Sequence, residues 1–147
     1  MEAHLNNIIT GVIATIIFYV FIEHILPHIT GYITKIPNIS GTWERIIDNG
    51  NNGYAEFKIK QTGNRIKANA KLHDGNQVRE FIYKGFFYPN QLILTFEQKD
   101  AAKTNIGSSV FILDSRNSKL KGKHLYYHHD SNEIKTLDVE YQKILKS

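Results

Sequence analysis

The sequence contains no cysteine and only three prolines among 147 residues. Without cysteine the chain has no disulfide, no thiolate metal ligand and no thiol nucleophile, so it must hold together by packing alone. Asp, Glu, Lys and Arg are absent from Ala3 to Ile22, and no Lys or Arg precedes Lys35. The length allows one compact domain and an appendage, and it excludes a second core of any size.

The uncharged stretch from Ala3 to Ile22 has the length of a membrane span, because an α-helix of this length covers roughly 30 Å of hydrocarbon. A buried core helix would be shorter and amphipathic. A secretory signal would carry a basic start and a small-residue cleavage site, which "MEAHLNN" and the following residues lack. We therefore predict an uncleaved transmembrane helix. The next apolar segment, residues 28–37, lies in the membrane interface or forms part of a second, re-entrant segment; both remain open.

Charge is distributed unevenly along the chain. All 18 Lys and Arg lie at or beyond Lys35, with 12 of the 14 acidic residues. The positive-inside rule places this basic part in the cytoplasm, so we expect a single-pass membrane protein with its globular part facing inward. A basic module also favours an anionic ligand or an anionic membrane surface as its partner.

Beyond Pro37 the hydrophobic pattern alternates, and turn residues recur at short intervals. Short loops between such runs require neighbouring antiparallel strands rather than crossover connections. We read eight strands in this part of the sequence, and none of it shows a helical period: "GTWERII", "YAEFKIKQ", "RIKANAKL", "QVREFIYKGFF", "QLILTFEQ", "GSSVFILD", "KLKGKHLYY" and "EIKTLDVEYQKI".

Eight meandering strands favour closure, because a closed sheet has no exposed edges. The predicted fold is therefore all-β: an eight-stranded antiparallel up-and-down (lipocalin-like) barrel over residues 36–147, preceded by a transmembrane helix and interfacial linker over residues 1–35. Gly41-x-Trp43 resembles the signature of the first strand in lipocalin-type barrels, where the glycine admits a tight chain path and the tryptophan plugs the closed end. Ala68 and Ala70 on one strand face leave room for a cavity, unless neighbouring aromatic rings fill it.

Cationic and aromatic residues share faces within the predicted strands. If Trp43 faces inward, the two-residue period of a strand turns Arg45 inward as well. The same alternation groups Arg79 with Phe81 and Tyr83, and Lys123 with Leu125 and Tyr127. An arginine inside a small barrel needs a carboxylate or an anionic ligand, since an unpaired buried charge is costly. The candidate carboxylates are Glu80, Asp138 and Glu140.

No enzyme motif stands out, and we expect neither catalysis nor a cofactor. The run His128, His129 and Asp130 does not suggest a metal site, because adjacent strand residues point to opposite faces. His124 and His128 lie on one face but are roughly 13 Å apart along an extended strand, too far for one ion.

The whole layout resembles a family of bacterial membrane effectors, the SMODS-associated, transmembrane, β-strand-rich effectors of cyclic-oligonucleotide-based antiphage signalling systems (CBASS). The matching stretches are "ISGTWE", "EFKIKQTGNRIKANA", "FIYKGFFYPNQLILTFE", "KLKGKHLYY" and "VEYQKI". The resemblance covers nearly the full chain. Members carry two N-terminal membrane segments, whereas this sequence shows one full span.

The resemblance implies a barrel that binds a cyclic dinucleotide made by a partner nucleotidyltransferase during phage infection. Binding would drive self-association of the transmembrane segments, disruption of the lipid bilayer and abortive infection. On this interpretation Arg45 and Arg79 contact phosphates, and Trp43, Tyr83 or Tyr127 shapes or stacks the pocket; no DNA or RNA polymer is involved. Two alternatives remain open: a membrane-tethered carrier of a small apolar ligand, and a non-catalytic adaptor with a filled barrel.

Overall fold

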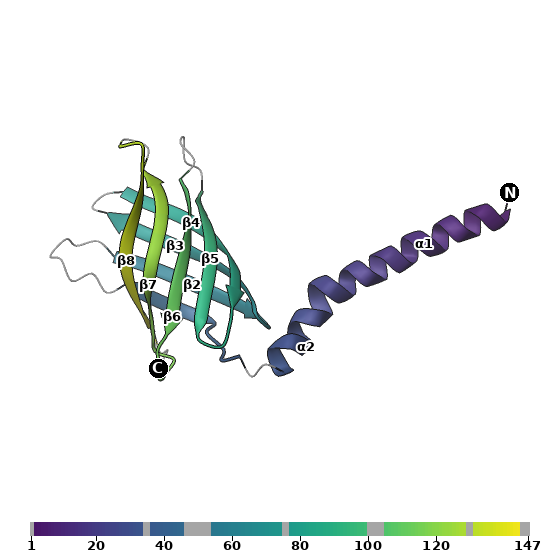
Figure 1. Cartoon of the computed structure of the whole chain (residues 1–147), viewed down its shortest axis with the longest axis horizontal. Coiled ribbons are helices and arrows are strands. Elements are labelled where there is room, and N and C mark those ends of the chain that lie inside the picture. The colour runs from purple at the N-terminus through teal and green to yellow at the C-terminus, as the bar shows by residue number, and fades with distance from the viewer. Residues whose placement is uncertain are drawn as a thin grey trace.

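The chain forms a long N-terminal helix followed by a closed eight-stranded antiparallel barrel (Figure 1). This computed structural model describes residues 2–33, 36–45, 54–74, 77–99, 105–128 and 131–144. The helical rod projects away from the barrel, and its C-terminal end lies beside one end of the strands (Figure 1).

The helical part consists of three consecutive segments: α1 (Glu2–Val20), a π-helical turn η1 (Phe21–Ile25) and α2 (Leu26–Ile33). The π-helical turn ends two residues before Pro27, and the N–H of Leu26, which follows the turn, donates to the Phe21 carbonyl five residues back. Proline has no N–H to donate and its ring clashes with the carbonyl four residues earlier, so an extra residue in the preceding turn lets the helix continue.

One helix in the described residues is long and apolar enough to cross a membrane. Its apolar stretch, Ile8–Ile29, has 22 residues and a mean hydropathy of 2.1, and most of its described side chains are exposed. By length and composition it fits a membrane span or a signal sequence. For residues 28–37, an interfacial position and a re-entrant segment both stay predictions. The structure continues the helix from His28 to Ile33, and residues 34–35 lie outside the described part.

The barrel strands are β1 (Gly41–Arg45), β2 (Tyr54–Thr62), β3 (Arg65–Asp74), β4 (Gln77–Phe87), β5 (Gln91–Gln98), β6 (Ile106–Leu113), β7 (Lys119–His128) and β8 (Glu133–Lys143). Each pairs antiparallel with the next, and β8 pairs with β1 to close the sheet. The predicted up-and-down barrel is confirmed. Ile46 and Ile47, predicted to extend the first strand, lie outside the described residues.

One half of the barrel interior holds most of the largest buried side chains. Large side chains fill the end where β1 begins, with Trp43 fully buried. The Trp43 Nε1–H donates to the Ile39 carbonyl at 2.9 Å, and Lys143 Nζ lies 5.5 Å from the ring centroid. Gly41 has a φ of 133°, which favours glycine. Gly41 thus adopts a conformation that suits glycine, and Trp43 is buried near the end of the barrel where β1 begins, which we call the closed end. The other buried side chains of this half include Ile39, Ile66, Phe87, Leu92, Leu113 and Leu120.

The helix meets the barrel at this same closed end, on the turn between β2 and β3. Pro27 is buried, and a Cβ added to Gly63 would lie 1.5 Å from the Pro27 carbonyl oxygen. Arg65 Nη1, at the start of β3, pairs with Glu23 Oε2 of η1 at 2.5 Å. The junction thus leaves the opposite end of the barrel uncovered by the helix.

Candidate functional site

A cavity of about 440 Å³ occupies the half of the lumen away from the helix. Its wall includes two small side chains, Ala55 on β2 and Ala70 on β3, which leave space that larger residues would fill. The prediction that the small side chains of β3 leave room for a cavity is thus confirmed for Ala70. Ala68 is buried and is not among the residues that line the cavity.

Arg45, the last residue of β1, lines this cavity. It lies two residues beyond the inward-facing Trp43 and opposite Tyr141 of β8 in the register that closes the barrel. Its side chain is half-buried, and no hydrogen bond or ion pair joins it to another described residue. Inside the lumen it therefore presents a guanidinium whose donors are not used by the described part of the protein.

Arg79 of β4 lines the same cavity. Leu72 lies opposite Arg79 on β3. As predicted, Arg79 shares a strand face with Phe81 and Tyr83, and this face lines the cavity. Two guanidinium groups, from strands that are far apart in the sequence, thus contribute to one lumen. The side chains that line this cavity, from the residues that the structure describes, include no Asp or Glu.

The carboxylates predicted as possible partners lie on the outside of the barrel. Glu80 pairs with Lys71 at 2.9 Å and with Lys99 at 3.6 Å. Asp138 pairs with Lys123 at 3.2 Å. Glu80 and Asp138 therefore pair with lysines on the outer face.

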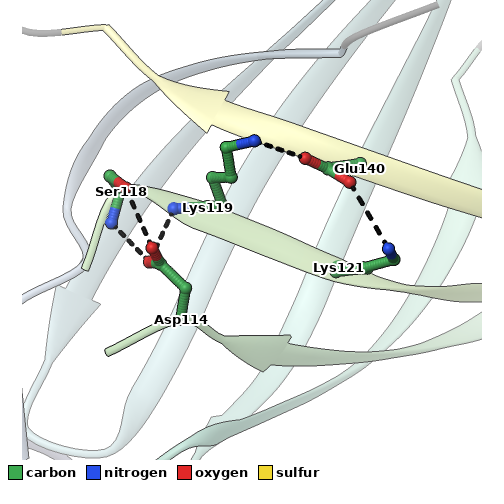
Figure 2. Close-up of polar contacts among 5 residues, drawn as sticks. All are labelled: Asp114, Ser118, Lys119, Lys121 and Glu140. Carbon is green, nitrogen blue, oxygen red and sulfur yellow. Dashed lines mark hydrogen bonds and ion pairs between the residues drawn. The ribbon is translucent and has the colours of Figure 1, made fainter. Parts of the chain in front are cut away.

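Glu140 is likewise engaged on the outer face. Figure 2 shows it between Lys119 and Lys121, at 3.0 and 3.8 Å. In the adjoining turn, Asp114 accepts hydrogen bonds from the backbone N–H groups of Ser118 and Lys119 and from the Ser118 hydroxyl (Figure 2). These bonds hold the pKa of the Asp114 carboxyl below its usual value.

The floor of the cavity is aromatic and uncharged. Tyr83 packs between Phe57 and Phe96, with ring centroids 5.0 and 5.2 Å away. Burial raises the pKa of Tyr83 well above its usual value, and the neighbouring Tyr141 phenol adds to the rise. Burial also raises the pKa of Tyr141 to about 12, although the charge of Arg45 opposes that rise. Both phenols are therefore neutral at physiological pH.

His124 completes this floor. Its Nδ1 lies 2.6 Å from the Ser109 hydroxyl oxygen, and its ring lies 5.6 Å from that of Phe96. Burial, assisted by the charge of Arg45, lowers the pKa of His124 to about 4, so the imidazole is neutral at pH 7. The cavity therefore combines neutral rings below with guanidinium groups above.

Four of the five predicted site residues line the cavity: Arg45, Arg79, Tyr83 and Tyr127. Trp43 lies in the closed half and does not line the cavity. Tyr127 shares a face with Lys123 and Leu125, as predicted, but that face is the outer one; its hydroxyl donates to Asn132 Oδ1, and its side chain reaches the rim of the cavity. Arg45, Arg79 and Tyr83 line the lumen together.

Sequence reasoning missed His124 and Tyr141 as lumen residues. The alternation on β7 groups His124 with Gly122 and Tyr126 on one face, but it does not reveal that this face is the inner one. Tyr141 could be placed beside Arg45 only by knowing that β8 pairs with β1. In the described chain no group of three His, Asp or Glu side chains is arranged to hold a metal ion; His129 and Asp130 lie outside the described residues.

Comparisons of the chain with protein-family models, with curated proteins and with solved structures find no match.

Proposed function

We propose that this protein is a membrane-anchored effector whose barrel binds a cyclic dinucleotide. The observation that carries the proposal is Arg45, a guanidinium with no hydrogen-bond or ion-pair partner among the described residues, which lines the same aromatic-floored cavity as Arg79. Removing a charge from water is costly unless an opposite charge and hydrogen bonds replace the water. An anionic ligand in the lumen would supply both.

Phosphate groups and bases fit the two chemical features of the cavity. The planar fork of a guanidinium donates two parallel hydrogen bonds to phosphate oxygens. Aromatic side chains such as Tyr83 and Phe96 can stack on bases, which stabilises binding by roughly 1–3 kcal/mol per base. A cyclic dinucleotide presents two phosphates and two bases in one compact ring, so it suits two arginines above an aromatic floor.

The size of the cavity supports a small ligand rather than a polymer. Ligand pockets usually have volumes of roughly 300–1,000 Å³. At about 440 Å³ this lumen lies in the lower part of that range. The space also disfavours an adaptor with a filled barrel, and the arginines disfavour a carrier of apolar molecules.

The anchor and the mouth of the cavity face apart. The helix docks on Gly63 at the closed end, whereas Arg45 and Arg79 lie toward the other end. With the basic barrel in the bacterial cytoplasm, a ligand from a partner nucleotidyltransferase enters from the solvent. Binding favours self-association of the membrane helices to the extent that the assembled state binds the ligand more tightly. The outcome of assembly is disruption of the inner membrane and death of the infected cell.

Thermal unfolding of the full chain in detergent tests the ligand class. We would measure the melting temperature alone, with a panel of cyclic dinucleotides, and with fatty acids. A bound ligand at about 100 times its dissociation constant adds about 2.7 kcal/mol to the free energy of unfolding. We expect stabilisation by a cyclic dinucleotide in the wild type and in Lys121→Gln, which removes an outer charge, but not in Arg45→Gln. Stabilisation by fatty acids alone would favour the apolar carrier, and stabilisation by neither would favour the adaptor.

A further inference from the structure

Three lysines form a row across the outer face of three neighbouring strands. Lys60 of β2 lies directly opposite Lys67 of β3, and Lys67 lies directly opposite Lys84 of β4. All three side chains are exposed. Like charges placed directly opposite on adjacent strands destabilise a sheet, so this basic row carries an electrostatic cost in the isolated protein.

The basic row differs from several other lysines on the barrel, which have carboxylate partners. Lys71, Lys119 and Lys123 each pair with a carboxylate at 2.9 to 3.2 Å. None of the three lysines of the row forms an ion pair with a described residue. The row is therefore a local excess of positive charge, suited to an anionic partner outside the chain.

An exposed apolar patch adjoins the basic row on the side toward the closed end. Phe86 of β4 lies opposite Ile93 of β5, and Ile93 lies opposite Val110 of β6. Phe86 is two residues from Lys84, a step of roughly 7 Å along the strand. The exposed members of the patch are Phe86, Tyr88, Ile93, Val110 and Ile112. A contiguous apolar patch bordered by charge marks a contact with a protein or a membrane.

The junction between helix and barrel indicates which contact it is. Arg65 lies directly opposite Phe86, so the apolar row continues from the residue that pairs with Glu23 of the helix. Because the helix leaves the barrel at this point, the patch and the basic row lie at the foot of the candidate span. Interfacial surfaces combine aromatic and aliphatic side chains with lysines that reach the headgroups.

We propose that this surface, the basic row together with the apolar patch, rests on the anionic headgroups of the bilayer that the helix crosses. The inference depends on the membrane anchor of the proposed function and not on the ligand. Each lysine next to an anionic surface favours contact by roughly fivefold, so the three together contribute about a hundredfold to the ratio of docked to undocked barrels. Docking leaves the opposite end of the lumen open to the cytoplasm.

Spin labels test the docking, because the chain has no cysteine of its own. The full chain would be placed in lipid nanodiscs, one chain per disc, with phosphatidylcholine alone or with added phosphatidylglycerol. Single labels at Ile93→Cys in the patch, Gln142→Cys on β8 and Ile13→Cys in the helix report accessibility to oxygen and to a water-soluble nickel complex. A variant with Lys60→Gln, Lys67→Gln and Lys84→Gln is compared with a control that carries Gln at the paired Lys119, Lys121 and Lys123.

We expect the label at position 93 to be shielded from nickel in the anionic discs and the label at position 142 to remain accessible. In the variant that lacks the three lysines of the basic row, the ratio of docked to undocked barrels should fall by about a hundredfold. In the control variant the label at position 93 should stay shielded. When the label at position 13 lies in the hydrocarbon, two results would overturn the docking alone. One is a label at position 93 that is as accessible to nickel as the label at position 142; the other is shielding of position 93 that survives loss of the basic row. Position 13 in water would overturn the anchor and the docking together. Shielding that appears only after addition of RNA or of an acidic protein would replace the bilayer as the partner.

Discussion

Replacing Arg45 by methionine should make the ligand-free barrel more stable. The guanidinium is half-buried, lines the cavity and has no hydrogen-bond or ion-pair partner among the described residues. Removing such a charge relieves its loss of hydration, and methionine keeps the apolar stem. For a partly buried group we expect a gain of roughly 1–2 kcal/mol, scaled down from the several kcal/mol of a fully buried ion. In a barrel of this size that gain raises the melting temperature by about 4–8 °C.

Two measurements on this variant separate a ligand site from a structural one. Scanning calorimetry of the full chain in detergent gives the melting temperature, with Lys121→Met as the control for loss of an outer charge. Titration by NMR follows the His124 imidazole, whose pKa of about 4 is held down by burial and by the charge of Arg45. The pKa of His124 should rise in Arg45→Met and stay unchanged in the control. A variant that is less stable than the wild type, with an unchanged His124, would refute an unpaired guanidinium in the lumen.

Three further predictions concern the floor, the closed end and the junction. His124 binds a proton near pH 6.5 when the chain is unfolded but only near pH 4 when it is folded. The free energy of unfolding should therefore fall by roughly 2 kcal/mol from pH 7 to pH 5. Urea titrations of His124→Gln should lack this pH-dependent loss of stability. Trp43→Phe removes a buried donor to Ile39 and should cost roughly 2–3 kcal/mol by urea denaturation, while cyclic-dinucleotide affinity stays unchanged; a loss of affinity would place Trp43 in the site. In Gly63→Asn, asparagine can adopt the positive φ of the turn, but its Cβ points at the Pro27 carbonyl. Spin-label distances between helix and barrel should therefore lengthen without loss of barrel stability. Unchanged distances would contradict the contact between Pro27 and Gly63.

The alternating pattern predicts the strands well because each strand has one buried face. On β3, Ile66, Ala68 and Ala70 alternate with polar residues, and all three face the interior. The inward position of Arg45 follows from Trp43 by the same period, since both lie on one short strand. Local pattern therefore determines the fold and the first cationic residue of the site.

Features that depend on contacts distant in sequence could not be predicted. A two-residue period groups Lys123 with Tyr127 but does not say which face is inside, because both faces of β7 carry apolar residues. The proximity of Tyr141 to Arg45 requires closure of β8 on β1. The helix continues past Pro27 because a π-helical turn accommodates the proline, and Gly63 gives its end a place to dock.

The most direct test of the central claim is the affinity of the full chain for cyclic dinucleotides, measured by equilibrium dialysis in detergent. The wild type and Lys121→Gln should bind at least one member of the panel, and Arg45→Gln combined with Arg79→Gln should lose that binding although its ligand-free barrel melts at no lower temperature than the wild type. Equal binding by the wild type and the double variant, or no binding by any of the proteins, would contradict a lumen built for a small anion.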